Sequence, residues 1–270
     1  MRRNLLLLVF TVYSVALFAA RVDTVSIYSQ SMKKEFKCVV IVPETGNKSE
    51  KWPVVYLLHG YSGNYSNWIT KVPALKSYAD QYHLMIVCPD GGYSSWYLDS
   101  PVDPAMRYDT YIAEEVPAFI ESHFPTIQNR QARAITGLSM GGHGGLYLGF
   151  RHAGYFGACG SMSGGVNLYA TRNKYDLKQR VGDTTNVNWK KYSVMGVIES
   201  YPKDSLAIIF DCGTEDFFYK DNRELHEKMI ELNIPHEYIA RPGKHDWNYW
   251  GNAVQFQLLF FRNYFDKMVK

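Results

Sequence analysis

Short apolar runs recur along the chain, and stretches with a helical pattern lie between them. The runs are apolar at consecutive positions, which is typical of strands covered on both faces of a sheet. They span residues 54–58, 84–88, 132–136, 158–162 and 206–210, and the helical stretches span 72–82, 108–123, 141–151, 221–232 and 247–269. Because strands and helices alternate, we expect an α/β fold with a mostly parallel central sheet covered by helices on both faces.

The composition supports one large core. The chain has 270 residues, of which 46% are hydrophobic and 20% charged, so long disordered stretches are not expected. Polar and apolar residues alternate over residues 24–42, with a polar break at residues 29–31, and this pattern predicts an N-terminal β-hairpin. No internal repeat or low-complexity linker interrupts the chain, and we expect a single domain over residues 21–270.

One segment departs from this alternation of strands and helices. Residues 164–201 are polar, rich in Asn, Lys, Asp and Tyr, and contain no clear strand. A long insertion in a compact domain is usually a functional loop or lid. The alternative is a solvated surface excursion without a role. We expect a loop insertion here and leave both interpretations open.

The N-terminus has the layout of a secretory signal peptide. Two arginines precede an apolar stretch over residues 5–18, and two small residues, Ala19 and Ala20, follow it. This stretch is short for a membrane-spanning helix. We therefore expect a signal peptide over residues 1–20 and an exported protein, periplasmic or secreted, without stable membrane insertion. Because a bulky residue would occupy the −3 position of the cleavage site, an uncleaved membrane anchor is the alternative.

The charge balance and the cysteines exclude several classes of protein. The formal net charge is +3 and no basic run occurs, so no nucleic-acid partner is expected. The cysteines match neither a zinc-ligand spacing nor a Cys-x-x-Cys motif; they are Cys38, Cys88, Cys159 and Cys212. We favour buried free thiols over the disulfides that an exported protein could also form. Neither a metal nor an organic cofactor is expected.

A Gly-x-Ser-x-Gly motif, Gly137-Leu138-Ser139-Met140-Gly141, lies between a predicted strand and a predicted helix. In that context the motif indicates a nucleophile elbow, a strained turn that presents the serine hydroxyl. Glycines at its two ends remove clashes that side chains would make. The N-terminus of the following helix points N–H groups and its positive dipole end toward the serine oxygen. We predict that Ser139 is a catalytic nucleophile.

A serine hydroxyl needs a general base, and in such elbows an acid and then a histidine follow the serine along the chain. His245 lies in a loop between a late strand, which begins at about His236, and the last helix. From such a loop it can reach the carboxyl edge of the sheet. The acid should follow the last long apolar run, where Asp211, Glu215 and Asp216 compete. Asp246, beside the histidine, is better explained as a loop or cap residue.

Five motifs in order give the chain a family resemblance. They are His59-Gly60-Tyr61-Ser62-Gly63 with Asn67-Trp68, Pro89-Asp90-Gly91-Gly92 with Ser95-Trp96-Tyr97, Gly137 to Gly142, Cys212-Gly213-Thr214-Glu215-Asp216, and Gly243-Lys244-His245-Asp246-Trp247. With them, nearly all of the chain after the predicted signal resembles the putative-esterase family of α/β-hydrolases. This family includes tributyrin esterases, S-formylglutathione hydrolases, feruloyl and acetylxylan esterases and mycolyltransferases. The resemblance implies an α/β-hydrolase fold with Asp216 as triad acid and His245 as base, and Glu215 is the main rival of Asp216.

Acyl transfer also needs hydrogen-bond donors for the oxyanion of the tetrahedral intermediate. In this fold one donor is the backbone N–H after the nucleophile, here Met140. The resemblance indicates the backbone N–H of Tyr61 as the other.

Aromatic residues near the expected catalytic edge are the candidates for substrate binding: Trp68, Trp96, Tyr97 and Trp247. Such side chains stack on a phenolic acyl group or a sugar, or else pack in the core. For Trp250, in the final predicted helix, we favour core packing.

These features predict an exported serine carboxylesterase for short-chain acyl, acetyl or hydroxycinnamoyl esters, either small molecules or groups linked to plant polysaccharide. An acyltransferase with the same triad is an alternative. The two activities would be distinguished by the products formed when an alcohol is added, since a transferase passes the acyl group to the alcohol instead of to water. A non-catalytic binding protein on the same scaffold is a second alternative, and the presence of Ser139, Asp216 and His245 argues against it. The oligomeric state is not predicted.

Overall fold

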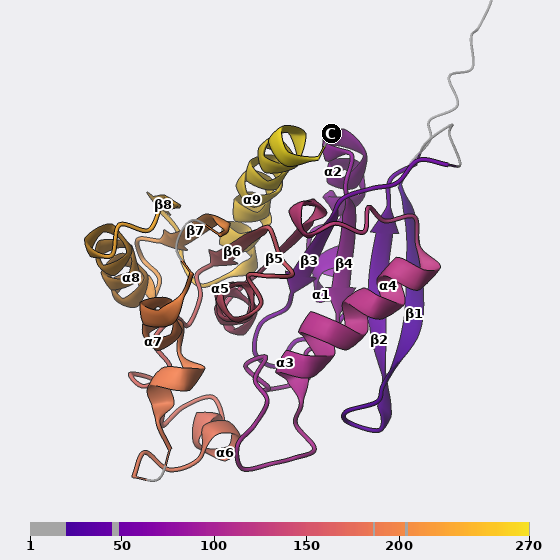
Figure 1. Ribbon diagram of the computed structural model, residues 1–270. Helices are drawn as coiled ribbons and strands as arrows, with labels where there is room; N and C mark the ends of the chain where they lie inside the picture. The colour runs from indigo at the N-terminus through magenta and orange to yellow at the C-terminus, as the bar shows by residue number, and fades with distance from the viewer. Residues whose placement is uncertain (1–19, 45–48, 186, 203–204, 270) are drawn as a thin grey trace, which may run out of the picture.

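An eight-stranded sheet with the strand order β1-β2-β4-β3-β5-β6-β7-β8 runs through the molecule (Figure 1). From β4 to β8 neighbouring strands are parallel, whereas β1 and β2 form an antiparallel hairpin and β2 is antiparallel to β4. The strands are β1 (Arg21–Ser29), β2 (Lys34–Val42), β3 (Val54–Leu58), β4 (Met85–Pro89), β5 (Arg133–Gly137), β6 (Ala158–Met162), β7 (Ala207–Gly213) and β8 (Glu237–Arg241). The predicted hairpin and the predicted mostly parallel sheet are confirmed.

The computed structural model describes residues 20–44, 49–185, 187–202 and 205–269. The predicted signal peptide, residues 1–20, lies outside these ranges except for Ala20. Within the described ranges, no helix combines the length and the apolar character needed to cross a bilayer.

Helices cover both faces of the sheet, as expected (Figure 1). On one side, α1 (Asn67–Lys71), α2 (Leu75–Tyr82) and α9 (Trp247–Met268) pack with Val55 and Leu57 of β3. On the other side, α3 (Tyr108–Thr110), α4 (Val116–His123), α5 (Met140–Arg151) and α8 (Tyr219–Glu231) pack with Tyr56 and Leu58. Successive β3 side chains therefore enter opposite core layers, which explains why the whole run is apolar.

Two predicted helices differ in detail. The helix predicted over 72–82 begins later, at Leu75 in α2, and a separate short helix, α1, ends before it at Lys71. Pro73 lies at this break; proline has no N–H to donate and disfavours helical backbone in the residue before it. The stretch 108–123 is helical throughout, and a π-helical turn, Tyr111–Glu115, joins α3 to α4.

The segment 164–201 between β6 and β7 is a packed helical insertion. It contains α6 (Leu177–Val181), a 3-10 turn (Trp189–Tyr192), α7 (Val194–Val197) and a second 3-10 turn (Ile198–Ser200). Leu168, Leu177 and Val194 are fully buried and join the core on the α5 side of the sheet. The interpretation as a solvated surface excursion is therefore wrong.

The cysteines are free and buried in the described part of the chain: Cys38, Cys88, Cys159 and Cys212. Burial raises the thiol pKa of each of them above its usual value. The thiols therefore stay protonated and behave as small apolar side chains, as predicted from the sequence.

Candidate active site

Ser139 lies at the turn from β5 into α5, and its backbone is strained. Its φ of 55° and ψ of −114° fall outside the regions that non-glycine residues usually adopt. A Cβ at Gly137 would lie 2.6 Å from the carbonyl oxygen of Leu58, and one at Gly141 would lie 2.6 Å from that of His59. Only glycine fits at these two positions, so the strand and the helix approach closely and the turn between them is sharp.

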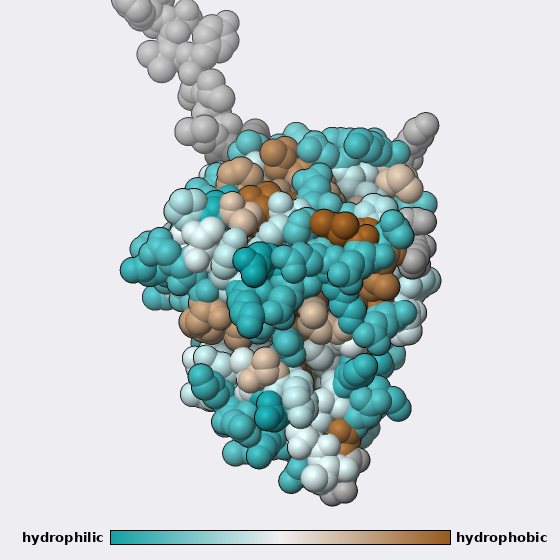
Figure 2. All heavy atoms as spheres, turned by 90° about the vertical axis from the view of Figure 1, so that its left-hand side faces the viewer, coloured by the Kyte–Doolittle hydropathy of each residue, from teal (hydrophilic) through white to brown (hydrophobic). Residues whose placement is uncertain are grey.

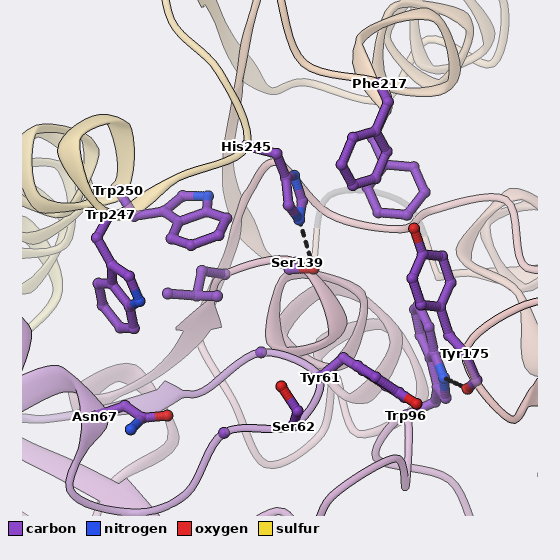
Figure 3. A pocket seen from close by; sticks show the side chains of 14 residues that line it. Tyr61, Ser62, Asn67, Trp96, Ser139, Tyr175, Phe217, His245, Trp247 and Trp250 are labelled. Carbon is purple, nitrogen blue, oxygen red and sulfur yellow. Dashed lines mark hydrogen bonds between the residues drawn. The ribbon is translucent and has the colours of Figure 1, made fainter.

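His245 connects Ser139 with Asp216. Its Nε2 lies 2.8 Å from Oγ of Ser139 (Figure 3). Its Nδ1 lies 2.7 Å from Oδ2 of Asp216. Asp216 lies in the turn after β7, and His245 lies in the loop between β8 and α9. Phe217 and Trp250 pack against the imidazole ring, with ring centroids 4.2 and 4.8 Å away. The ring is thus held in the plane that joins the hydroxyl to the carboxylate.

The competing carboxylates have other partners. The side chain of Glu215 is 56% exposed and lies 3.8 Å from Nζ of Lys244. Asp211 is fully buried below the site and accepts a hydrogen bond of 2.8 Å from Nε2 of Gln257. Asp246 accepts a hydrogen bond from the backbone N–H of Tyr249 and caps α9, as predicted from the sequence.

The two backbone N–H groups proposed for the oxyanion are available. On either side of Met140, the N–H of Ser139 donates to Met162 and that of Gly141 donates to Leu138. After Tyr61, the N–H of Ser62 donates to Tyr93. Within the described residues, the N–H groups of Tyr61 and Met140 themselves have no protein acceptor.

The buried imidazole of His59 fixes the peptide between Gly60 and Tyr61. Its Nδ1 lies 2.8 Å from the carbonyl oxygen of Gly60, and its Nε2 accepts a 2.7 Å hydrogen bond from the N–H of Gly91. The proton must therefore be on Nδ1, which donates to Gly60. Burial lowers the pKa of His59, so its ring is neutral. Because the C=O of Gly60 and the N–H of Tyr61 belong to one planar peptide, His59 also sets the direction of that N–H.

A cleft of about 250 Å³ opens above Ser139 and is lined mainly by aromatic residues. Trp96 and Trp247 line it, as expected for substrate-binding residues. Trp250 also lines it, although only 7% of its surface is exposed. Trp68 and Tyr97 do not line the cleft, so their prediction as substrate-binding residues is wrong. The Trp68 indole N–H donates to the carbonyl of Leu58, and the Tyr97 hydroxyl donates to that of His59. Both side chains pack in the core.

Further cleft residues were not among the predicted binding residues. Tyr175 comes from the insertion, and Phe217 and Phe218 follow Asp216; all three line the cleft. In Figure 3, Tyr175 and Phe217 lie on the same side of Ser139, opposite Trp247 and Trp250. Phe217 and Phe218 directly follow a predicted triad residue and could have been found from that proximity, whereas no strand or motif flanks Tyr175.

Within the described ranges, no group of three or more His, Cys, Asp or Glu side chains is placed to hold a metal ion. The sheet order, the strained serine turn and the sequence order Ser139, Asp216, His245 define an α/β-hydrolase of the serine hydrolase class.

Comparison with known proteins gives the family. The family model described as "Putative esterase" matches residues 29–261, so the chain belongs to this esterase family and is an enzyme acting on carboxylic ester bonds. An acetyl esterase of Caldicellulosiruptor saccharolyticus is 28% identical over 85% of this chain and 94% of its own. A ferulic acid esterase structure is 29% identical and superimposes with a TM-score of 0.79 over 92% of this chain and 100% of its own. The fluorophosphonate-binding serine hydrolase F of Staphylococcus aureus, 21% identical, has the same fold, with a TM-score of 0.82 over 90% of this chain and 99% of its own.

Proposed function

We propose that this protein is an exported serine carboxylesterase that uses Ser139, His245 and Asp216 as its catalytic triad. The hydrogen-bonded series from Asp216 through His245 to Ser139, with distances of 2.7 and 2.8 Å, is the observation that carries the proposal. A base within hydrogen-bond reach of the nucleophile, itself oriented by a carboxylate, is the arrangement that activates a serine hydroxyl.

In the first half of the reaction, Oγ of Ser139 attacks the ester carbonyl while Nε2 of His245 takes its proton. The carbonyl oxygen becomes an oxyanion, which the N–H groups of Tyr61 and Met140 stabilise. His245 then gives the proton to the leaving alkoxide, and an alcohol departs from the acyl-enzyme. Asp216 stays ionised and stabilises the imidazolium formed in between.

In the second half, His245 takes a proton from water, and the resulting hydroxide attacks the acyl carbon. The second tetrahedral intermediate collapses when His245 returns the proton to Oγ of Ser139. A carboxylic acid is released and the enzyme is restored.

Short-chain acyl, acetyl or hydroxycinnamoyl esters are the proposed substrates, on small molecules or on plant polysaccharide. The names of the acetyl esterase and ferulic acid esterase relatives support this range. Trp96, Tyr175 and Phe217 line one side of a cleft of about 250 Å³, which suits a small or flat acyl group better than a long chain. The basic residues and the apolar stretch at the start of the sequence support export. An exported enzyme can reach esters that are bound to a polymer outside the cell.

Labelling with a fluorophosphonate and Ser139→Ala test the proposal. The variant should lose the label and lose kcat by roughly 10³-fold or more. Ser62 also lines the cleft, and Ser62→Ala should still be labelled because no histidine contacts this serine in the described structure. A label on Ser62, or a Ser139→Ala variant that keeps a tenth of the activity, would overturn the assignment. A panel of nitrophenyl esters from acetate to octanoate, with methyl ferulate and acetylated xylan, then ranks the acyl groups.

A further inference from the structure

A second cavity lies in the insertion, away from Ser139. Its volume is about 490 Å³, which is within the roughly 300–1,000 Å³ typical of small-ligand sites. Its lining residues come from positions 167–199, together with Lys228 of α8. Figure 2 views the side of the molecule that carries α7 and α8, where hydrophilic residues dominate and hydrophobic ones form small separate patches. The cavity itself is lined by apolar as well as polar side chains, among them Tyr169, Trp189 and Met195.

Hydrogen bonds across the insertion hold the walls of the cavity. Oγ of Ser193 donates to the carbonyl of Val166 and accepts the N–H of Leu168, at 2.9 and 3.2 Å. From α8, Nζ of Lys228 donates to the carbonyl of Met195 at 2.7 Å. Because these bonds tie the insertion to itself and to α8, the cavity is formed before any ligand arrives.

The cavity presents aromatic surface beside amide donors. Trp189 is buried, and Tyr169, which is 51% exposed, meets it at an interplanar angle of 79° with ring centroids 6.4 Å apart. The side-chain oxygens of Asn167 and Asn188 accept backbone N–H groups of Ala170 and Lys190. In the described structure, the two amide nitrogens have no acceptor, so each remains available as a donor.

Two lysines and one glutamate line the cavity, and both lysines face the glutamate. Oε1 of Glu199 lies 2.6 Å from Nζ of Lys228, and Oε2 lies 4.0 Å from Nζ of Lys190. An anionic ligand would have to displace this carboxylate from its lysine. The lining therefore suits a neutral ligand with an apolar face for the rings and many oxygen atoms for the donors. A sugar unit has both properties.

We propose that this cavity is a carbohydrate subsite, which holds a sugar unit of a polymer while an ester group on that polymer reaches Ser139. The inference rests on the proposed esterase function for its purpose, but the binding itself does not require catalysis. The insertion links the two sites physically. It begins beside the nucleophile, where the N–H of Gly165 donates to the carbonyl of Ser139 at 3.2 Å, and Tyr175 of the same segment lines the catalytic cleft.

Binding of unesterified xylotetraose to the full chain tests the subsite without any turnover. Isothermal titration should give saturable binding to the wild type and a loss of at least tenfold in affinity for Tyr169→Ala. Trp189→Phe keeps an aromatic ring at the buried position but removes the indole N–H, and it should also bind more weakly than the wild type. Tyr28→Ala is the matched control, because Tyr28 is similarly exposed, at 47%, but lies on β1 at the opposite edge of the sheet.

Activity on acetylated xylan relative to 4-nitrophenyl acetate gives the second measurement. Tyr169→Ala should lower this ratio through KM for the polymer, and Tyr28→Ala should not. Absence of saturable binding, or binding that Tyr169→Ala and Trp189→Phe leave unchanged, would overturn the subsite. If Ser139→Ala kept its activity while xylotetraose still bound, the proposed function would fail and the subsite would stand.

Discussion

The phenol of Tyr61 donates a hydrogen bond of 3.1 Å to Oδ2 of Asp176, although the two residues are 115 positions apart. The backbone N–H of Tyr61 is a proposed oxyanion donor, and Asp176 belongs to the insertion. Burial, followed by the nearby Asp176 carboxylate, raises the pKa of Tyr61 to about 12, so its hydroxyl remains a donor. Asp176 has a φ of 58° and follows Tyr175, whose carbonyl accepts the indole N–H of Trp96 at 3.0 Å. The insertion is therefore fastened to both loops that border Ser139.

Removal of this hydrogen bond should weaken catalysis. A hydrogen bond to a charged acceptor contributes about 1.5–3 kcal/mol, and part-exposure reduces that value, so we expect Tyr61→Phe to lower kcat/KM by roughly 3- to 10-fold. Asp176→Asn should have a similar or smaller effect. The two changes remove one interaction, so the double variant should be no worse than the poorer single variant. Steady-state kinetics of this cycle, with Tyr28→Phe as a distant control, measures the coupling; strictly additive losses would contradict it.

The proposed triad acid, Asp216, can be tested against Glu215, its neighbour in the chain. Asp216→Asn should lower kcat by about 10²- to 10⁴-fold, because the imidazole loses its counter-charge and the tautomer that Nδ1 requires. Glu215→Gln should stay within a few-fold of the wild type, since its side chain is 56% exposed and faces Lys244. Kinetics with 4-nitrophenyl acetate and circular dichroism of both variants provide the comparison. Reversed phenotypes would show that the assignment of Asp216 is wrong.

Much of this arrangement could be predicted from local sequence. Ser139, Asp216 and His245 each follow a recognisable strand, and parallel strands end at one edge of a sheet, so the structure brings these three side chains together. Their catalytic roles stay predictions. Tyr175 could not be placed, because its position depends on hydrogen bonds with distant loops rather than on its neighbours in the chain. Trp68 and Trp247 are equivalent as aromatic residues near loops, and only tertiary packing makes one a core residue and the other part of the cleft wall.

In the proposed mechanism, His59 orients the oxyanion donor Tyr61 through the backbone, so its loss should lower kcat more than it changes KM. Without the imidazole, the carbonyl of Gly60 keeps only the N–H of Gly63, at 3.1 Å, so the Gly60–Tyr61 peptide is held less firmly. A displaced donor stabilises the transition state poorly while ground-state binding changes little. We expect His59→Ala to lower kcat by about 10- to 10²-fold. His59→Asn should recover part of this loss, because its amide nitrogen can donate to Gly60 in place of Nδ1. A variant series in which KM rises and kcat is unchanged would contradict a positioning role.

Asp211 should make the stability of the protein depend on pH. Burial raises the pKa of this carboxyl to about 6 from an ordinary value of 3.8, and Gln257 and Arg241 oppose the shift only in part. The folded state therefore holds the proton more tightly than the unfolded state does. The stabilisation is complete below about pH 4 and is lost as the pH rises through about 6. A difference of about two pKa units corresponds to a loss on the order of 3 kcal/mol for this fully buried group.

Asp211→Asn removes the titration and keeps the size of the side chain and an oxygen that can accept from Gln257. Urea unfolding of both proteins between pH 4 and 7.5 measures the difference in free energy of unfolding. This difference should move in favour of the variant as the pH rises, with most of the change between pH 4 and 6.5. Other titrating groups affect both proteins alike and cancel in the difference. A difference that is constant across this range would mean that Asp211 titrates alike in the folded and unfolded states, and a shift toward the wild type would mean that the buried carboxylate is stabilised by its partners.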